Sequence, residues 1–157
     1  MIRVGLGFDT HKLAPERKLI IGSVSISHTH GCVGHSDADV LIHAICDALL
    51  GAANLRDIGF HFPDTDPKYK NINSKILLEE THKRIAENNW KIENIDTTVV
   101  IQEPKIQSYI PQMQKSLAET LHIAEDCISI KAKTSEQMGF IGRKEGVSAY
   151  AIALISK

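Results

Sequence analysis

The chain has 157 residues, 43% of them hydrophobic, which is the size and composition of one ordinary domain with a sizeable core. Its 18 basic and 19 acidic residues leave a formal charge of -1, so no overall field favours nucleic acid or an anionic membrane as a partner. An anionic substrate would have to be held by local charge. We expect a single domain over residues 1–157.

The three cysteines, Cys32, Cys46 and Cys127, are odd in number and lack a Cys-x-x-Cys spacing. This usage is typical of reduced, packed thiols in a cytosolic protein. A strand pattern begins at the second residue, and no apolar run approaches membrane-spanning length. We therefore expect a cytoplasmic protein, unless a leader has been removed.

The opening segment, residues 2–11, has the period-two pattern of a strand with one face in a core. Its apolar positions are Ile2, Val4, Leu6 and Phe8, which alternate with Arg3, Gly5, Gly7 and Asp9. Asp9 and His11 lie two apart, so in an extended chain their side chains point to the same side. With His43 as the candidate third ligand, they predict a metal site.

Residues 12–18 contain a proline and four charges and are predicted to form an exposed loop. Residues 19–26 are predicted to form a short strand pair or hairpin around Gly22, and residues 28–34 a polar loop punctuated by glycine. His28 and His30 have the spacing of metal ligands, but loop histidines two apart are usually solvated, and this is the interpretation that we favour.

Residues 36–55 are predicted to form a helix capped by Ser36, with a broad apolar face. Asp39, His43 and Asp47 are four apart and form a polar stripe on the opposite side. The stripe is either a solvated face or an enclosed site, and the upstream Asp9-x-His11 favours the site. We further expect Asp47 or Asp39 to orient the His43 imidazole.

Residues 54–71 are irregular and rich in proline and aspartate, which indicates either a simple turn or a functional loop. The remaining elements predicted from periodicity are helices at 74–87 and 109–122 and strands at 92–102, 128–135 and 147–155. We expect an α/β (α+β) sandwich, with a mainly four-stranded sheet and about three helices on one face.

The last predicted strand, residues 147–155, is nearly apolar on both faces. Such a strand is typically buried from both sides. About three helices cover only one face of a sheet, so the other face needs a cover from elsewhere. Another copy of the chain is the economical answer.

The proposed metal ligands have a definite chemistry. One aspartate and two histidines leave a tetrahedral zinc ion with one open position, as in sites that bind substrate. Residues 131–136, Lys-Ala-Lys-Thr-Ser-Glu, add cations, hydroxyls and a carboxylate, which suit a phosphate accompanied by magnesium. The pair Gly5 and Gly7 is weak evidence for a dinucleotide loop, because no third glycine or helix follows it.

Several longer motifs resemble the 2-C-methyl-D-erythritol 2,4-cyclodiphosphate synthase family, in order along the whole chain. They are Gly-Phe-Asp-x-His (7–11), Gly-His-Ser-Asp-x-Asp-Val-x-x-His (34–43), Asp-Ala-Leu-Leu-Gly-Ala (47–52), Asp-Ile-Gly-x-x-Phe-Pro-Asp-Thr-Asp-Pro (57–67), Gln-x-Pro-Lys (102–105) and Gly-Phe-x-Gly-Arg-x-Glu-Gly (139–146).

The resemblance implies a metal-dependent phosphorus–oxygen lyase of the non-mevalonate isoprenoid pathway. The 2-phosphate of 4-diphosphocytidyl-2-C-methyl-D-erythritol 2-phosphate would attack the β-phosphorus of the same molecule and release CMP. By resemblance, Zn2+ binds Asp9, His11 and His43, and Mg2+ or Mn2+ binds Glu136 and bridges the substrate diphosphate. His35 and Thr134 would stabilise the transition state.

The resemblance also implies the substrate contacts and the assembly. The expected substrate-binding residues are Asp9, His11, His35, Ser36, Asp57, Ile58, Gly59, Phe62, Pro63, Asp64, Thr65, Asp66, Ile101, Gln102, Glu103, Pro104, Lys105, Ile106, Gln107, Ala132, Lys133, Thr134, Ser135, Glu136, Phe140 and Arg143. The family forms a homotrimer with active sites between subunits, and an isoprenoid diphosphate is a candidate ligand of the trimer cavity. The alternatives are a zinc phosphohydrolase and a non-catalytic module that binds zinc and isoprenoid phosphates.

Overall fold

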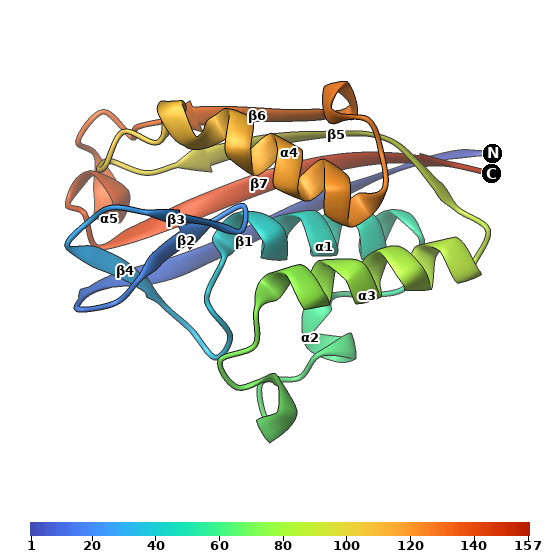
Figure 1. Cartoon of the computed structure of the whole chain (residues 1–157), viewed down its shortest axis with the longest axis horizontal. Helices are drawn as coiled ribbons and strands as arrows, with labels where there is room; N and C mark the ends of the chain where they lie inside the picture. Colours follow the sequence, from blue (N-terminus) through green and yellow to red (C-terminus); the bar gives the residue numbers. More distant parts are fainter.

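A computed structural model describes residues 1–157 (Figure 1) and contains a five-stranded sheet of order β4-β1-β7-β5-β6 and a two-stranded sheet, β2-β3. The strands are β1 Ile2–Pro15, β2 Leu19–Ile21, β3 Val24–Ile26, β4 His30–Val33, β5 Lys91–Val100, β6 Ile128–Lys133 and β7 Gly146–Ser156. The helices are α1 Val40–Ala52, α2 Ile58–His61, α3 Ser74–Glu87, α4 Ile110–Leu121 and α5 Gly139–Gly142. Short 3-10 turns are η1 Pro67–Tyr69, η2 Gln107–Tyr109 and η3 Glu125–Cys127.

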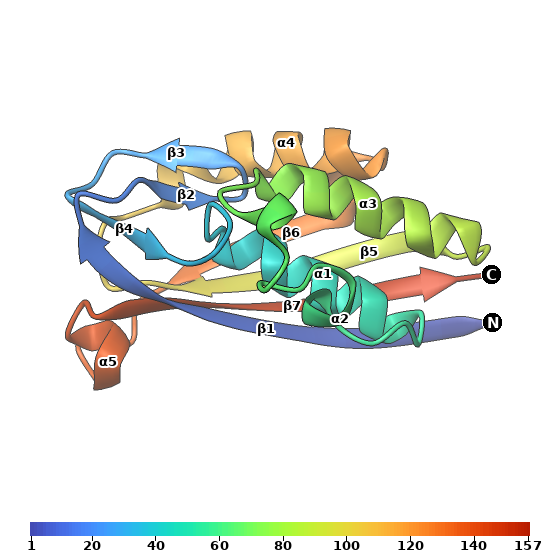
Figure 2. The ribbon, with the colours of Figure 1, turned by 90° about the horizontal axis from the view of Figure 1, so that it is seen from below.

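The three long helices lie on one side of the main sheet, as predicted. Helix α1 packs directly on β1 and β7, α3 packs on α1, and α4 packs on α3 and β6. Figure 2 shows α3 and α4 above the sheet and no long helix over its opposite face. All neighbouring strands of the main sheet are antiparallel except β5 and β6. None of the helices is long and apolar enough to cross a lipid bilayer.

The expectation of four main strands was one strand short, because residues 12–15 and 30–33 pair instead of forming loops. Strand β1 continues to Pro15, and its last four residues pair antiparallel with β4. Charges, glycine and proline along both segments hide the strand pattern, yet an edge position tolerates them. Residues 54–71 also contain two short helical turns, α2 and η1, where an irregular loop was expected.

Helix α1 begins at Val40, four residues later than the Ser36 cap predicted from sequence. Asp39 caps it by accepting a hydrogen bond from the N–H of Ile42 at 3.1 Å. The same buried carboxylate accepts from the N–H groups of Gly22 and Ser23 at 2.9 and 2.6 Å. Burial raises the pKa of Asp39 to about 6, against the effect of these three donors. Asp39 thus fixes the β2-β3 turn to the start of α1 and is not part of a solvated stripe.

Strand β1 has the opposite orientation from the one its pattern suggested. The apolar residues Ile2, Val4, Leu6 and Phe8 are 47–71% exposed, and Gly5 and Gly7 are buried. An added Cβ at Gly7 would lie 1.8 Å from the carbonyl oxygen of Ala44 in α1, and one at Gly5 would lie 2.0 Å from that of Ala48. The glycines therefore allow the α1 backbone to lie directly on the strand. This close packing is their role, and they form no dinucleotide loop.

Replacing Gly7 with alanine should strongly destabilise the chain, because the new methyl group would collide with helix backbone that cannot rotate away. We expect the free energy of unfolding to fall by about 3 kcal/mol. Gly51→Ala is the matched control, since nothing lies within 4 Å of a Cβ there. In a helix that change should stabilise the chain by about 0.5–1 kcal/mol. Urea unfolding of the two variants measures the difference, and equal effects would refute the packing argument.

The apolar face of β1 is continuous with one face of β7. Tyr150 and Ile152 are 46% and 47% exposed, and the Phe8 and Tyr150 rings are 5.0 Å apart. On the other face of β7, Val147, Ala149 and Ala151 are buried under α1. Within one chain β7 is therefore covered on one side only, and its other face is the one for which the sequence analysis expects a cover from another copy.

Candidate metal centre and adjoining pockets

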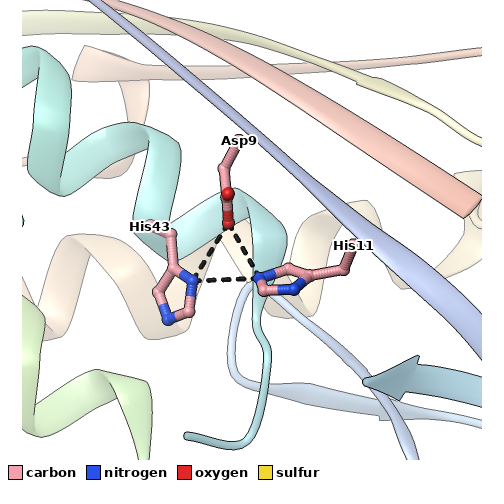
Figure 3. Close-up of side chains that lie close together, drawn as sticks. All are labelled: Asp9, His11 and His43. Atoms are coloured by element: carbon pink, nitrogen blue, oxygen red, sulfur yellow. Dashed lines mark hydrogen bonds and ion pairs between the residues drawn. The ribbon is translucent and has the colours of Figure 1, made fainter. Parts of the chain in front are cut away.

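Two residues of β1 and one residue of α1 meet where the strand crosses the start of the helix (Figure 3). The Oδ2 atom of Asp9 lies 2.9 Å from Nε2 of His11 and 3.0 Å from Nδ1 of His43. The two histidine nitrogens are 3.2 Å apart. Asp9, His11 and His43 form the only group of three or more histidine, cysteine, aspartate or glutamate side chains in the chain that is arranged to hold a metal ion. The predicted triad is thus brought together.

The electrostatics of the triad favour a charged carboxylate. Burial raises the pKa of Asp9, but hydrogen bonds with His11 and His43 outweigh it and bring the pKa down to about 2. Burial lowers the pKa of His11, yet the hydrogen bond and charge of Asp9 outweigh it and raise this pKa. The three side chains are partly shielded from water: the exposed fraction is 26% for Asp9, 15% for His11 and 13% for His43.

The donor set fits a zinc ion. Ligand atoms about 2.0–2.1 Å from a tetrahedral centre lie roughly 3.3 Å from one another. The separations of 2.9, 3.0 and 3.2 Å among the three donor atoms are close to that value. Two imidazole nitrogens and one carboxylate oxygen also match the ligands that zinc uses when a fourth position stays open.

The expected carboxylate partners of His43 are wrong. Asp39 is the buried cap of α1, and Asp47 accepts a hydrogen bond from the N–H of Ile58 at 2.7 Å. The Nε2 atom of His43 lies instead 3.0 Å from Oγ of Ser74 and 3.1 Å from Oγ of Ser36. Helical spacing points to side chains one turn away, whereas the actual partners come from a loop and from the start of α3.

A cavity of about 550 Å³ opens beside the triad. Its polar lining includes His35, Ser36, Asp64 and Thr65, and His11 and His43 form one wall. Its apolar lining is Ile58, Phe62, Pro63, Tyr69, Ile72 and Leu77. Residues 58–65 therefore supply part of the lining of the cavity beside the triad, which favours the functional interpretation of that loop. We call this space the triad cavity.

The loop residues of the triad cavity are fixed by short-range caps. Asp57 caps α2 through the N–H of Phe60, and Asp66 caps η1 through the N–H of Lys68. The Nε2 atom of His35 lies 3.4 Å from the carbonyl oxygen of Asp66. His35 is thereby placed at the cavity wall beside the metal ligands.

A second cavity, of about 220 Å³, lies where β5 and β6 end. Its lining consists of Ile101, Gln102, Pro104, Lys105, Ile106, Gln107, Ala132, Lys133 and Thr134. We call it the β5-β6 cavity. Nearby, Thr134 donates a hydrogen bond to Glu136 at 3.2 Å, and Ser135 donates to the Met138 carbonyl oxygen at 2.7 Å. No residue lines both this cavity and the triad cavity.

The other predicted substrate contacts lie elsewhere. Phe140 lines a third cavity, of about 600 Å³, together with His11 on the β7 side of the triad. Glu103 pairs with Lys144 at 2.9 Å, and both lie with Arg143 around a polar cavity of about 320 Å³. His28 and His30 line that same cavity without forming a metal-ligating group. Within one chain, the predicted site residues therefore lie around several separate cavities and do not form one continuous site.

The model of the YgbB family matches residues 2–156 of this sequence. The chain belongs to the YgbB family. Its relatives in this family include the 2-C-methyl-D-erythritol 2,4-cyclodiphosphate synthase of Parabacteroides distasonis, which is 58% identical over 156 residues. That alignment covers 99% of this chain and 97% of the relative.

Solved structures of similar proteins have the same fold. The bifunctional IspDF of Campylobacter jejuni has a TM-score of 0.95 and 43% identity; the match covers 99% of this chain and 42% of that longer protein. IspF of Plasmodium falciparum, solved as a CDP complex, has a TM-score of 0.87 and 36% identity over 98% of this chain and 95% of that one. The α/β fold and family expected from the motifs are confirmed.

Sequence reasoning missed two polar residues, Asp37 and Ser74, that lie close to the triad. In the sequence Ser74 was only the first residue of a predicted helix, and Asp37 only a position within the motif at 34–43. Ser74 is fully buried, and its hydroxyl donates to Asp37. A serine at the first turn of a helix is normally explained as a local cap, so no pattern in the chain distinguishes this one.

Proposed function

We propose that this protein cyclises 4-diphosphocytidyl-2-C-methyl-D-erythritol 2-phosphate to 2-C-methyl-D-erythritol 2,4-cyclodiphosphate and releases CMP. The observation that carries the proposal is the triad of Asp9, His11 and His43 at the wall of a cavity of about 550 Å³, in a chain whose residues 2–156 match the YgbB family. Relatives with that enzyme name and a relative solved with CDP support the reaction and the nucleotide. The enzyme is a metal-dependent lyase that acts in the cytoplasm.

The reaction needs positioning and charge neutralisation more than a protein nucleophile. Nucleophile and electrophile belong to one molecule, so folding the substrate brings the 2-phosphate to the β-phosphorus. Zinc at Asp9, His11 and His43 would supply a Lewis acid for the β-phosphate, and magnesium or manganese at Glu136 would neutralise the α and β phosphates. His35 and Thr134 would stabilise the charge that develops at the phosphorus.

The two cavities suit the two ends of this substrate. The triad cavity has an apolar floor and the polar residues Asp64 and Thr65, which suit a methyl-branched polyol. We assign the erythritol moiety to Asp57–Gly59 and Phe62–Asp66. The β5-β6 cavity is small, and its lining includes Lys105, Lys133 and Thr134, which suit a nucleoside phosphate. We assign cytidine to Ile101–Gln107 and Ala132–Thr134, and Phe140 and Arg143 to the approaches of the diphosphate.

A homotrimer would join these cavities into one site. The triad cavity and the β5-β6 cavity share no lining residue, although one substrate has to reach both. The exposed apolar face of β1 and β7 gives a surface on which copies can pack. We propose three copies with each active site between two of them. An isoprenoid diphosphate in the cavity on the trimer axis would be a further ligand.

The products of a single incubation test the reaction. With the cytidyl substrate, zinc and magnesium, we expect CMP and a cyclic diphosphate in equal amounts, detected by phosphorus NMR and mass spectrometry. Activated water in place of the 2-phosphate would give CMP with an open-chain bisphosphate and would identify a phosphohydrolase. A complete absence of CMP would favour the non-catalytic module that binds zinc and isoprenoid phosphates. Either of these results would overturn the proposal.

A further inference from the structure

The metal-facing orientation of His43 leaves its other ring nitrogen inside the protein. Nδ1 faces Asp9 and His11, at 3.0 and 3.2 Å, so Nε2 points the opposite way. An imidazole that gives the Nδ1 lone pair to a metal carries its proton on Nε2. That N–H is a donor at a largely buried position and needs an acceptor.

Two hydroxyl groups lie within reach of this nitrogen, and they differ in how they are held. Ser36 Oγ, at 3.1 Å, already accepts from the N–H of Ala38 at 3.1 Å. Ser74 Oγ, at 3.0 Å, donates its own hydrogen to Oδ1 of Asp37 and so keeps its lone pairs for His43. Ser74 therefore acts as an acceptor whose hydrogen is directed away from the imidazole.

Asp37 holds Ser74 at two points. Oδ1 accepts the Ser74 hydroxyl, and Oδ2 accepts the Ser74 backbone N–H at 3.0 Å. Two backbone hydrogen bonds also join the loop before α1 to the loop before α3. The N–H of Asp37 donates to the carbonyl oxygen of Ile72 at 3.1 Å, and the N–H of Asn71 donates to that of His35 at 2.8 Å. Ser74 is fully buried at the first turn of α3, so its hydroxyl has little freedom to move.

We infer that Asp37 and Ser74 are positioning residues for the metal centre, which fix the tautomer and ring orientation of His43 through the chain Asp37 carboxylate, Ser74 hydroxyl, His43 Nε2–H. A carboxylate next to the hydroxyl polarises it and makes it a better acceptor, and the imidazole in turn becomes a more basic ligand. The inference deepens the proposed function and rests on its metal site. It also links the ligand to the loop that carries His35.

Zinc affinity tests the inference without any measurement of catalysis. Competition with a chromophoric chelator is measured on the purified chain, with folding verified by circular dichroism and urea unfolding. We expect Ser74→Ala to bind zinc 10–100-fold more weakly than the unmodified chain, which is the usual cost of losing a hydrogen-bond partner of a ligand. Thr81→Val is the matched control, because it removes from α3 a buried hydroxyl that has no hydrogen-bond partner. The control should keep the original affinity.

A double-mutant cycle distinguishes the proposed chain from a general loosening of the fold. Asp37→Asn alone should weaken zinc binding, and in the Ser74→Ala background the same change should add little, because Asp37 acts through Ser74. Additive losses of zinc affinity would mean that Asp37 acts independently of Ser74. That result would overturn the proposed hydrogen-bonded series from Asp37 through Ser74 to His43. Since Asp37→Asn leaves Ser74 in place, it also tests the inference if Ser74→Ala fails to fold.

The outcomes also separate this inference from the metal site itself. If the unmodified chain binds no zinc, the metal assignment fails, and the inference fails with it. If the unmodified chain binds zinc, His43→Ala does not, and Ser74→Ala and Asp37→Asn both bind it normally, only the positioning role is wrong. A weakened Ser74→Ala with a normal Thr81→Val supports it.

Discussion

The His43→Ala variant should lose both stoichiometric zinc and CMP release while the chain stays folded. Truncation removes one of three donor atoms, and the two that remain lie on one strand and no longer enclose an ion. Without the metal, the charge that develops on the β-phosphate loses its main stabiliser, so CMP release should fall by at least about a hundred-fold. Elemental analysis and a CMP release assay measure the two effects.

The variant should fold because His43 is not part of the hydrophobic core. Its side chain lies at the wall of the triad cavity, while its neighbours Ile42, Ala44 and Ile45 supply the core contacts of α1. His82→Ala is the matched control, since this histidine of α3 lies against His122 and away from the triad. The control should keep its zinc and its rate. Stoichiometric zinc in His43→Ala would show that the triad assignment is wrong.

The grouping of Asp9, His11 and His43 could be predicted because part of it follows from local geometry. Asp9 and His11 lie two apart on a strand, and a strand places such side chains on one side. The third member of the triad, His43, was predicted from the polar stripe of a helix with a broad apolar face, supported by the family motifs. Helix α3 was predicted with its correct limits, Ser74–Glu87, because its periodicity has no competing interpretation.

The orientation of β1 could not be predicted, because alternation fixes which residues share a face but not which face is covered. The apolar residues Ile2, Val4 and Leu6 suggested a core, yet the covered face is that of the glycines. A helix backbone that lies on a strand requires small residues beneath it, so the part of β1 under the α1 backbone carries the glycines Gly5 and Gly7. The apolar face is then free for another chain.

The partners of His43 were missed for a related reason. Asp39 and Asp47 share its helix face in the sequence, but the N–H groups of Gly22, Ser23 and Ile58 engage their carboxylates. These donors come from turns whose position depends on tertiary packing. Residues close in the chain were predicted to interact, whereas the contact with Ser74 joins positions 31 apart.

Two inactive variants should restore activity to each other if each active site lies between two copies. His43→Ala damages the triad cavity, and Thr134→Ala damages the β5-β6 cavity, and no residue lines both. In the proposed arrangement the first cavity comes from one chain and the second from its neighbour. Each variant alone should then be nearly inactive, because every site contains one damaged half. Mixed trimers contain one site built from two intact halves.

The size of the recovery is fixed by counting. A site is intact when the chain that supplies the triad cavity carries only the Thr134 change and its neighbour carries only the His43 change. With equal, random mixing each condition holds for about half of the chains, so about a quarter of the unmodified activity should return. The variants are unfolded together and refolded, with each variant refolded alone as the control. Light scattering gives the number of chains per particle. A monomer, or a mixture no more active than its parts, would exclude a shared site, because each chain would then have to hold the whole substrate across two separate cavities.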